Sequence, residues 1–141
     1  MDVLEGGSGL NLTFEVRDGI VHHTGPARPI TLEGAIVRLA DRIAYVNHDI
    51  DDALRAGIIA DGDLPADLVQ VLGDSHSCRI NTMVTDIIKT SGGRGCIKMS
   101  PAVGQATDGL RDFLFDRVYI GSEAKKEEAK ASRLVEELYT Y

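Results

Sequence analysis

The sequence has 141 residues, enough for one domain with a hydrophobic core, and its 43% hydrophobic and 26% charged residues are typical of a globular protein. No apolar run approaches the roughly 20 residues of a membrane-spanning helix, and the acidic, Gly-rich start does not have the pattern of a signal peptide. A net charge of -7 argues against a broad nucleic-acid-binding surface, although it leaves room for a local basic pocket.

In the first part of the chain, residues 1–9 are predicted to be a flexible lead, which looks like a cut into a larger protein. Asn11 or Thr13 then caps a short helix that runs through about His22, and a Gly- and Pro-containing loop follows at 25–29.

The strongest predicted element is a helix from Thr31 to about Ala56, ended by Gly57. No Pro interrupts it, and its apolar residues recur at steps of three and four, which places them on one narrow stripe. These residues are Leu32, Ile36, Leu39, Ile43, Val46, Ile50 and Leu54.

In the next part, a turn-rich link at 58–64 leads to a short helix from Pro65 to Leu72. After Gly73, Asp74 or Ser75 caps a further helix, which the segment SGGRG at 91–95 ends. Its predicted apolar face holds Ile80, Met83, Val84, Ile87 and Ile88.

The last part begins with residues 96–100, which are expected to be extended, with a short strand as one option. Ser100 and Pro101 open the next helix, Gly121 breaks it, and Ser122 starts a charged final helix. The apolar positions of these two helices are Val103, Ala106, Leu110, Phe113, Leu114, Val118 and Tyr119 in the first, and Ala129, Leu134, Val135 and Leu138 in the last. The sequence therefore predicts an all-α fold over residues 1–141, a bundle of five to six helices with at most one or two short strands.

Three polar residues share one face of the long helix. Asp41, Tyr45 and Asp49 are spaced i, i+4, i+8, which places them about 12 Å end to end and roughly opposite the apolar stripe. Such a face is either the solvated side of an amphipathic helix or the wall of a cleft. Ala40 and Ala44 favour the cleft, because small neighbours leave room for close approach to the carboxylate. One carboxylate alone does not make a metal site.

The other polar candidates have plain structural interpretations. His22 and His23 are adjacent on a helix end, so at most one of them can enter a given site, and a surface position is preferred for both. His48 is two turns from Asp41 and is expected to be exposed or partly packed. Arg79 is expected to pair with an acidic neighbour, with a phosphate as the alternative.

Two further motifs are weak. The SGGRG segment resembles a phosphate loop only superficially, because it lacks the Lys-Ser/Thr ending and follows a helix. Cys78 and Cys96 lack the spacing of a zinc site; one disulfide is formally possible, but two reduced thiols in a cytoplasmic protein are the preferred interpretation.

The sequence also resembles a known protein family, and this resemblance gives information that residue spacing alone does not. The run LEGAIVRLADRIAYVNHDIDDALRAG resembles a block of the bacterial deoxyguanosine triphosphate triphosphohydrolase family, within the HD superfamily, and ADRIAYxxHDxxDA is its most specific part. Weaker similarities in the family's order extend over nearly the whole chain, in GLNLTFEVRDGIVHHTG, LGDSHSCRINTMVTDII, IKMS, LRDFLFDRVY and KKEEAKASRLVEELYTY. The chain thus resembles the carboxy-terminal part of such an enzyme.

The resemblance implies roles for four residues. The family's metal site uses a His, an adjacent His-Asp pair and a distant Asp, and Asp41 resembles that distant Asp. Arg42 matches a basic position near the substrate phosphates, and Tyr45 and Asp49 match positions that contact the deoxyribose. The first His, the His-Asp pair and the following GHxxE element are not in this sequence. The pair His48–Asp49 follows Asp41, which is the wrong order, so no catalytic residue is assigned in this chain.

The implied chemistry is hydrolysis of a deoxynucleoside triphosphate to a deoxynucleoside and triphosphate. A divalent metal (Mn, Mg or similar) would polarise the α-phosphate and activate water. Because one Asp cannot replace a set of ligands, we expect this chain alone to bind no metal and to be inactive without the upstream segment of the same protein. The resemblance also implies a cytoplasmic homo-oligomer.

Two other functions stay open. The chain is alternatively a non-catalytic helical module for oligomerisation or regulation, which needs only the apolar stripe and the charged last helix. A third option is an HD hydrolase of another nucleotide. The enzyme interpretation requires Asp41, Tyr45 and Asp49 to face one cleft.

Overall fold

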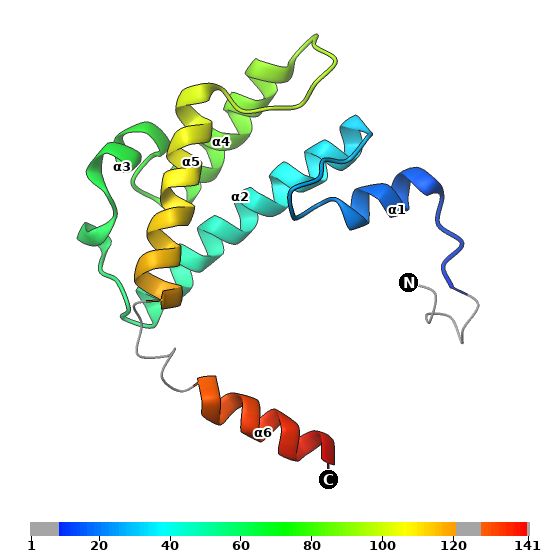
Figure 1. Cartoon of the computed structure of the whole chain (residues 1–141). Helices are drawn as coiled ribbons and strands as arrows, with labels where there is room; N and C mark the ends of the chain where they lie inside the picture. The colour runs from blue at the N-terminus through cyan, green and yellow to red at the C-terminus, as the bar shows by residue number, and fades with distance from the viewer. Residues whose placement is uncertain (1–8, 121–127, 141) are drawn as a thin grey trace.

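The computed structural model describes residues 9–120 and 128–140, and every regular element within them is helical, which confirms the all-α prediction (Figure 1). No helix in this part of the chain is both long and apolar enough to cross a membrane. The α helices are α1 (Phe14–Val21), α2 (Leu32–Arg55), α3 (Ala66–Leu72), α4 (His76–Ser91), α5 (Pro101–Leu114) and α6 (Glu128–Thr140). A 3-10 turn, η2 (Asp61–Asp63), precedes α3, and a π-helical turn, η3 (Phe115–Ile120), follows α5.

Side-chain hydroxyls begin four of these helices. The caps are Thr13, Thr31, Ser75 and Ser100, and each hydroxyl accepts a hydrogen bond from the backbone N–H three residues later. Of the paired alternatives in the sequence, Thr13 and Ser75 are therefore the caps, and Asn11 and Asp74 are not. The helix starts follow directly from local sequence chemistry.

The core lies where α2 packs against α4 and α5, and α3 packs against α4 and α5. The central part of the α2 stripe is buried there, and α5 contributes the facing side chains. Figure 1 shows α2 running the length of this bundle, with α1 lying beside the first half of α2. The buried apolar residues are Ile43, Val46, Ile50, Ala53, Ile59, Leu64, Leu72, Met83, Val103, Ala106, Leu110 and Leu114.

The first part of the α2 stripe is not buried in the same way. Leu32 is 45% exposed and Ile36 is 51% exposed, whereas Ile43 is 5% exposed. Ile36 instead lies along an apolar groove between α2 and α4, to which Val84 and Ile88 of α4 also contribute. The stripe therefore continues beyond the core that the described residues form.

Residues 96–100 form no strand; the chain there is extended without a paired neighbour among the described residues. The Ser91 hydroxyl donates to the Lys98 carbonyl at 3.2 Å and accepts from the Lys98 N–H at 3.0 Å. The Asp86 carboxylate accepts the Ser100 N–H at 2.7 Å. Side chains of α4 thus satisfy the backbone groups that a strand partner would otherwise satisfy.

In the carboxy-terminal region, the structure agrees only in part with the prediction from the sequence. The helix that begins at Pro101 continues to Ile120, but its last turn is π-helical. The predicted start at Ser122 and the side chain of Ala129 lie outside the described residues. On α6, Leu134, Val135 and Leu138 are 61%, 55% and 71% exposed, so the predicted packing side faces solvent in this chain.

The position of α1 depends on a close approach at the start of α2. A side-chain carbon added at Gly34 would lie 2.6 Å from the Pro29 side chain, so only glycine fits there. The buried Asp18 carboxylate of α1 accepts the Ile30 N–H at 2.8 Å and contacts the His22 ring at 2.7 Å. The Ile30 hydrogen bond, followed by the contact with His22, lowers the pKa of Asp18 against the opposing effect of burial. These contacts fix the two ends of the loop, with His22 at one end and Pro29 and Ile30 at the other.

Candidate functional site

A cleft of about 520 Å³ opens beside the middle of α2, between the loop that follows α1 and the end of α5. It brings together residues from three separate parts of the sequence. The lining residues are His23, Thr24, Gly25, Arg38, Leu39, Asp41, Arg42, Tyr45 and Arg111. The polar face of α2 is thus a wall of a cleft, and not simply the solvated side of a helix.

Asp41 is the only carboxylate among the described residues that line this cleft. Its side chain is exposed, and it has no hydrogen bond or ion pair within the part of the chain that the structure describes. Carboxylates near arginines usually form ion pairs with them, as Asp108 does with Arg42 at 2.9 Å. Asp41 is therefore open to a ligand that enters the cleft.

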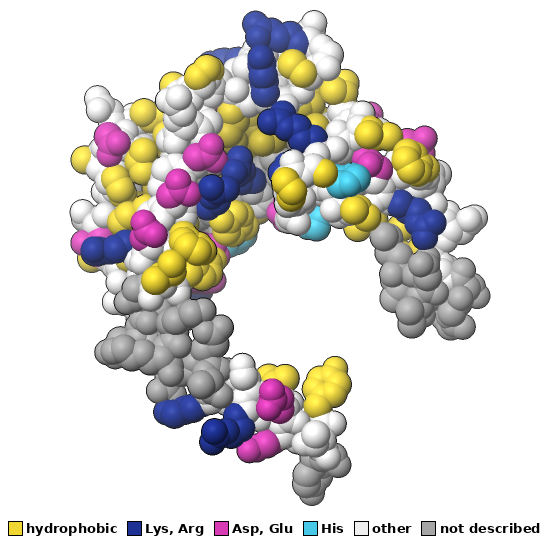
Figure 2. Space-filling model, in the orientation of Figure 1, with side chains coloured by type: hydrophobic (Ala, Val, Ile, Leu, Met, Phe, Trp, Pro, Cys, Tyr) yellow, Lys and Arg dark blue, Asp and Glu magenta, His cyan; other side chains and the backbone are white. Residues whose placement is uncertain are grey.

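Three guanidinium groups line the same cleft, those of Arg38, Arg42 and Arg111. A chain with a net charge of -7 thus has a local basic pocket, as the composition allowed. Arg42 pairs with Asp108 of α5, and Arg111 pairs with Asp112 at 3.1 Å, so part of the positive charge is already compensated. Figure 2 shows Lys and Arg side chains on this face of the bundle, among hydrophobic and acidic ones.

Tyr45 lies one turn after Asp41 and separates the cleft from a smaller hollow of about 370 Å³. The smaller hollow is lined by Tyr45, Arg111, Asp112, Phe115 and Tyr119. Burial, followed by the charge of Asp49, raises the pKa of Tyr45, so its phenol stays protonated at neutral pH. Tyr45 and Arg111 line both hollows, which therefore adjoin.

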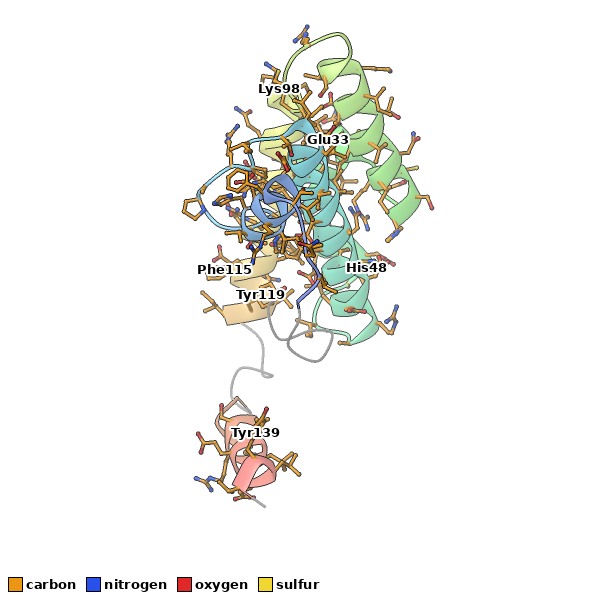
Figure 3. All side chains as sticks on the ribbon, turned by 90° about the vertical axis from the view of Figure 1, so that its right-hand side faces the viewer. Glu33, His48, Lys98, Phe115, Tyr119 and Tyr139 are labelled. Carbon is orange, nitrogen blue, oxygen red and sulfur yellow. The ribbon has the colours of Figure 1, made fainter. Side chains whose placement is uncertain are left out.

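Asp49 does not line the larger cleft. Its carboxylate accepts a 2.5 Å hydrogen bond from the Tyr119 hydroxyl, across 70 residues of sequence. This hydrogen bond is the main cause that raises the pKa of Tyr119 to about 12. In Figure 3, Phe115 and Tyr119 lie on one side of α2 and His48 lies on the other. Of the four residues that the resemblance selects, three therefore line the cleft, whereas Asp49 lines neither hollow and is bonded to Tyr119, which lines the smaller one.

The histidines divide between two places. His23 lies partly exposed just after the end of α1, in line with the expected surface position, and it also lines the cleft, because the loop turns back along α2. His22 contacts Asp18 instead. His48 is exposed, as expected, with its ring centroid 6.1 Å from that of His76.

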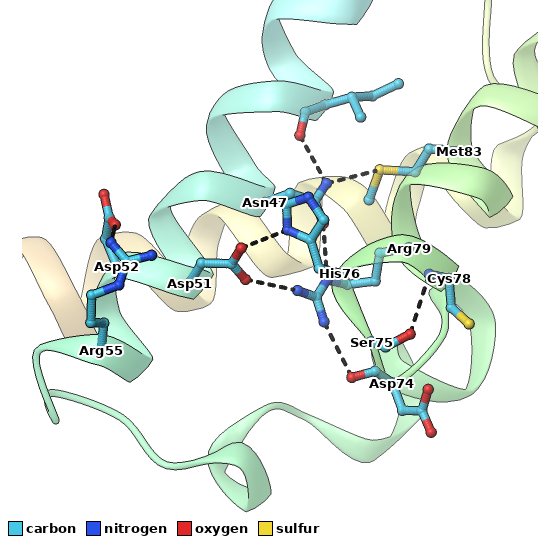
Figure 4. Close-up of polar contacts among 11 residues, drawn as sticks. Asn47, Asp51, Asp52, Arg55, Asp74, Ser75, His76, Cys78, Arg79 and Met83 are labelled. Atoms are coloured by element: carbon cyan, nitrogen blue, oxygen red, sulfur yellow. Dashed lines mark hydrogen bonds and ion pairs between the residues drawn. The ribbon is translucent and has the colours of Figure 1, made fainter.

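A second polar group on α2 faces the core. The Asn47 side-chain oxygen accepts from Arg79 at 2.9 Å, and the Asn47 amide donates to the Ile43 carbonyl at 2.8 Å (Figure 4). The Asp51 carboxylate contacts the His76 ring at 2.7 Å and the Arg79 guanidinium at 3.7 Å. Burial lowers the pKa of Arg79, which the charges of Asp51 and Asp74 oppose. Arg79 is thus a structural residue and not part of the cleft, as the acidic-neighbour interpretation predicts.

The sequence interpretation missed Arg38, Arg111 and Tyr119, and it did not predict that His23 lines the cleft. Arg38 carries a usable signal, because it precedes Asp41 by three residues and Tyr45 by seven, which is the spacing of one helix face. Arg111 and Tyr119 carry none of this kind, because their place depends on how α5 packs against α2.

Asp41 fits one position of a metal site and no more. Among the described residues, no group of three or more His, Cys, Asp or Glu side chains is arranged to hold a metal ion. The two cysteines, Cys78 and Cys96, are exposed and not bonded to each other. A complete metal site would therefore need ligands from outside the part of the chain that is described.

Comparisons with known proteins extend the resemblance. A family model described as "Phosphohydrolase-associated domain" matches residues 97–141. A deoxyguanosinetriphosphate triphosphohydrolase-like protein of Caldanaerobacter subterraneus subsp. tengcongensis is 53% identical over 142 residues, which are 100% of this chain and 42% of that protein. Proteins of the same description from Clostridium tetani and Bordetella pertussis are 46% and 30% identical and are matched by 96% and 94% of this chain.

The chain spans less than half the length of the curated relatives that it matches, 42% for those from Caldanaerobacter and Clostridium tetani and 47% for that from Bordetella pertussis. The similarity is nevertheless continuous along the chain and includes the long helix that carries Asp41, Arg42 and Tyr45. The chain is accordingly similar, over its whole length, to the carboxy-terminal part of deoxyguanosinetriphosphate triphosphohydrolase-like proteins.

Proposed function

We propose that this chain supplies part of the substrate cleft and one metal ligand of a metal-dependent deoxynucleoside triphosphate triphosphohydrolase. The observation that carries the proposal is the Asp41 carboxylate, which has no partner among the described residues although it lines a cleft with three arginines. An unpaired carboxylate in such a place suits a divalent cation, and Arg42 and Arg111 suit a polyphosphate. The names of the relatives support a deoxynucleoside triphosphate, with dGTP as the first substrate to test.

The proposed roles follow the order of residues along α2. Asp41 holds one position of the metal, which when bound supplies charge to polarise a phosphate and to activate water. Arg42 offsets phosphate charge, and Arg111 faces it across the cleft. Tyr45 orients the sugar with its protonated phenol, which can donate a hydrogen bond, and Asp49 contributes indirectly by holding the Tyr119 hydroxyl at the smaller hollow.

The ion pair of Arg42 determines how this arginine would bind a phosphate. Arg42 of α2 forms an ion pair with Asp108 of α5. A phosphate would therefore bind a guanidinium that is already oriented. The planar guanidinium has five N–H groups, enough to keep the Asp108 contact and to bind a phosphate oxygen as well. Binding would therefore need little rearrangement of the two helices.

The chain alone is proposed to be inactive. One carboxylate does not hold a divalent ion firmly, and the described residues add no second and third ligand beside it. The missing ligands are proposed to come from the upstream segment of the same protein, which would also complete the base-binding side of the cleft.

The decisive experiment measures triphosphate release from all four deoxynucleoside triphosphates with manganese or magnesium. We would compare the chain alone with the same chain joined to its upstream native segment, each with and without Asp41→Asn. The expected result is activity only in the joined protein, lost by at least about 10³-fold on Asp41→Asn. A folded joined protein without activity on any of the four substrates would contradict the proposal. Activity on a different nucleotide alone would favour an HD hydrolase of that nucleotide.

One observation favours a second candidate, a helical interaction module. Apolar residues are exposed along the groove between α2 and α4, where Ile36, Val84 and Ile88 are 51%, 42% and 66% exposed. The exposed face of α6 adds Leu134 and Leu138. Surfaces of this kind are common at protein interfaces. This candidate becomes the better account if the joined protein is inactive yet assembles through these faces.

A further inference from the structure

Arg38 makes an unusual set of contacts at the rim of the cleft. Its guanidinium donates to four backbone carbonyls of one loop, those of His22 at 2.7 Å, Thr24 at 3.1 Å, Gly25 at 2.5 Å and Ala27 at 2.9 Å. Three of these acceptors share the two N–H groups of Nη1, and Gly25 binds Nη2. No other side chain among the described residues makes a comparable set of bonds to one loop.

The loop that Arg38 holds is the outer wall of the cleft. His23, Thr24 and Gly25 line the cleft directly, and all three lie within the held segment. Gly25 has a φ of 77°, a conformation that glycine adopts without strain, and it turns the carbonyls of the segment toward α2. The Arg38 side chain of α2 thus binds the backbone of this wall at four points.

Apart from Arg38, the hydrogen bonds that hold this loop lie towards its ends, where the Asp18 carboxylate contacts the His22 ring at 2.7 Å and the His23 ring contacts the Ile20 carbonyl at 2.6 Å. Of the helices, α1 has substantial contacts only with α2, and Phe14, Val16 and Val21 on it are 69%, 47% and 61% exposed. The Asp18 carboxylate fixes Ile30 at the far end of the loop, but not residues 23–27. Segments with few buried apolar contacts open locally at low free energy, so bonds at this point decide how often the wall is formed.

We propose that Arg38 is a positioning residue that fixes the wall of the cleft by its geometry, and that its charge does not serve mainly to bind phosphate. This inference rests on the proposed function for the nature of the substrate, but not for the contact itself. The planar fork of arginine reaches several acceptors at fixed angles, whereas the lysine ammonium is a single point on a flexible stem. Arg38→Lys therefore keeps the charge and removes the geometry, and Arg38→Gln keeps a planar donor without the charge.

The first test is amide hydrogen exchange of the 141-residue chain. We expect Arg38→Lys and Arg38→Gln each to lower the protection of the α1 amides and of the Ile30 amide about tenfold, with α4 unchanged. The control is Arg28→Lys, at an exposed arginine of the same loop, which should leave α1 unchanged. Unchanged α1 protection in Arg38→Lys would overturn the proposal. An equal fall in α4 would also overturn it, because Arg38 would then support the whole bundle.

The second test uses the chain joined to its upstream native segment. We expect Arg38→Lys and Arg38→Gln to raise the KM for the triphosphate to a similar extent, about tenfold, with a smaller change in kcat. A KM near the wild-type value in Arg38→Lys, with a high KM in Arg38→Gln, would instead assign Arg38 to phosphate binding by charge. If the joined wild-type protein has no activity, the proposed function fails, and the exchange experiment alone decides the role of Arg38.

Discussion

The long helix α2 carries two polar groups that differ in nearly every physical respect. The α2–α4 polar cluster (Asn47, Asp51, His76, Arg79) has Asn47 and Arg79 buried at its centre and the partly exposed Asp51 and His76 at its edge, and its members contact one another. The cleft group (Arg38, Asp41, Arg42, Tyr45) is open to solvent on another side of the same helix, and it includes the unpartnered Asp41. A buried polar group must be satisfied for the fold to be stable, whereas an open carboxylate beside arginines adds little to stability. The difference separates Arg79, whose bonds support the fold, from Asp41, which is available to a ligand.

The largest expected effect comes from breaking the α2–α4 polar cluster. Arg79 is 3% exposed, and Arg79→Ala leaves the Asn47 oxygen without its donor, Asp51 without its cation and a cavity beside Met83. We expect the free energy of unfolding to fall by about 3 kcal/mol, measured by urea denaturation. The control is Arg55→Ala, whose pair with Asp52 is exposed, with an expected change below about 0.5 kcal/mol. Equal effects of the two changes would contradict the structural role of the cluster.

A substitution at Gly34 tests whether the loop that lines the cleft also contributes to the stability of the fold. Gly34→Ala places a methyl group 2.6 Å from the Pro29 side chain, so the loop from α1 must shift. We expect a loss of about 1–3 kcal/mol in thermal or urea unfolding, reduced by the better helix propensity of alanine. Gly62→Ala, where nothing lies within 4 Å, is the matched control and should be close to neutral. A neutral Gly34→Ala would show that the loop is not fixed as the structure describes.

A smaller effect, dependent on pH, is expected at the bond between Tyr119 and Asp49. The pKa of Tyr119 is raised to about 12, above its ordinary value of 10.0, so the bond stabilises the fold below pH 10 and this contribution is lost between pH 10 and 12. Since Tyr119 is 45% exposed, we expect Tyr119→Phe to cost less than about 1 kcal/mol at pH 8.

Absorbance at 295 nm checks the titration of Tyr119 directly. The wild-type chain should have one phenol that titrates near pH 12 and that disappears in Tyr119→Phe. The control is Tyr139→Phe, at a residue that is 91% exposed, and it should leave this late titration in place. A late phenol that persists in Tyr119→Phe would place the strong hydrogen bond elsewhere.

The smallest expected effect concerns the cleft group itself. Asp41→Asn removes a charge that no described residue pairs with, so the unfolding free energy should change by less than about 0.5 kcal/mol. The same substitution is expected to abolish activity in the joined protein. A large loss of stability in Asp41→Asn would make Asp41 a structural residue and would remove the contrast with Arg79.

Local chemistry explains why most of the fold could be predicted. Thr31 as a cap, Gly73 between two helices and Pro101 after Ser100 are signals carried by a few neighbouring residues, and each marks a helix boundary in the structure. Periodicity likewise predicts which face of α2 is apolar. It does not say which element covers that face, so Ile43 is buried and Ile36 of the same stripe is half exposed.

The candidate site could be predicted only as far as one helix extends. Asp41, Arg42 and Tyr45 lie within five residues, and helix geometry is sufficient to place them together. Arg111 reaches them only through the packing of α5 on α2, and His23 only through the turn that Arg38 holds. Asp49 was expected to join its neighbours in the cleft, but its bond to Tyr119 depends on a contact across 70 residues.

The Ser91 hydroxyl, which binds both backbone groups of Lys98, has a practical consequence for engineering. These two hydrogen bonds hold together the ends of the loop formed by residues 92–97, so the loop can be lengthened while its ends keep their positions. Loop-closure entropy rises only slowly with length, so a flexible insertion after Gly93 should be tolerated far better than one within α4. The exposed Cys96 at the same tip offers an attachment point for a fluorophore, remote in sequence from the residues that line the cleft.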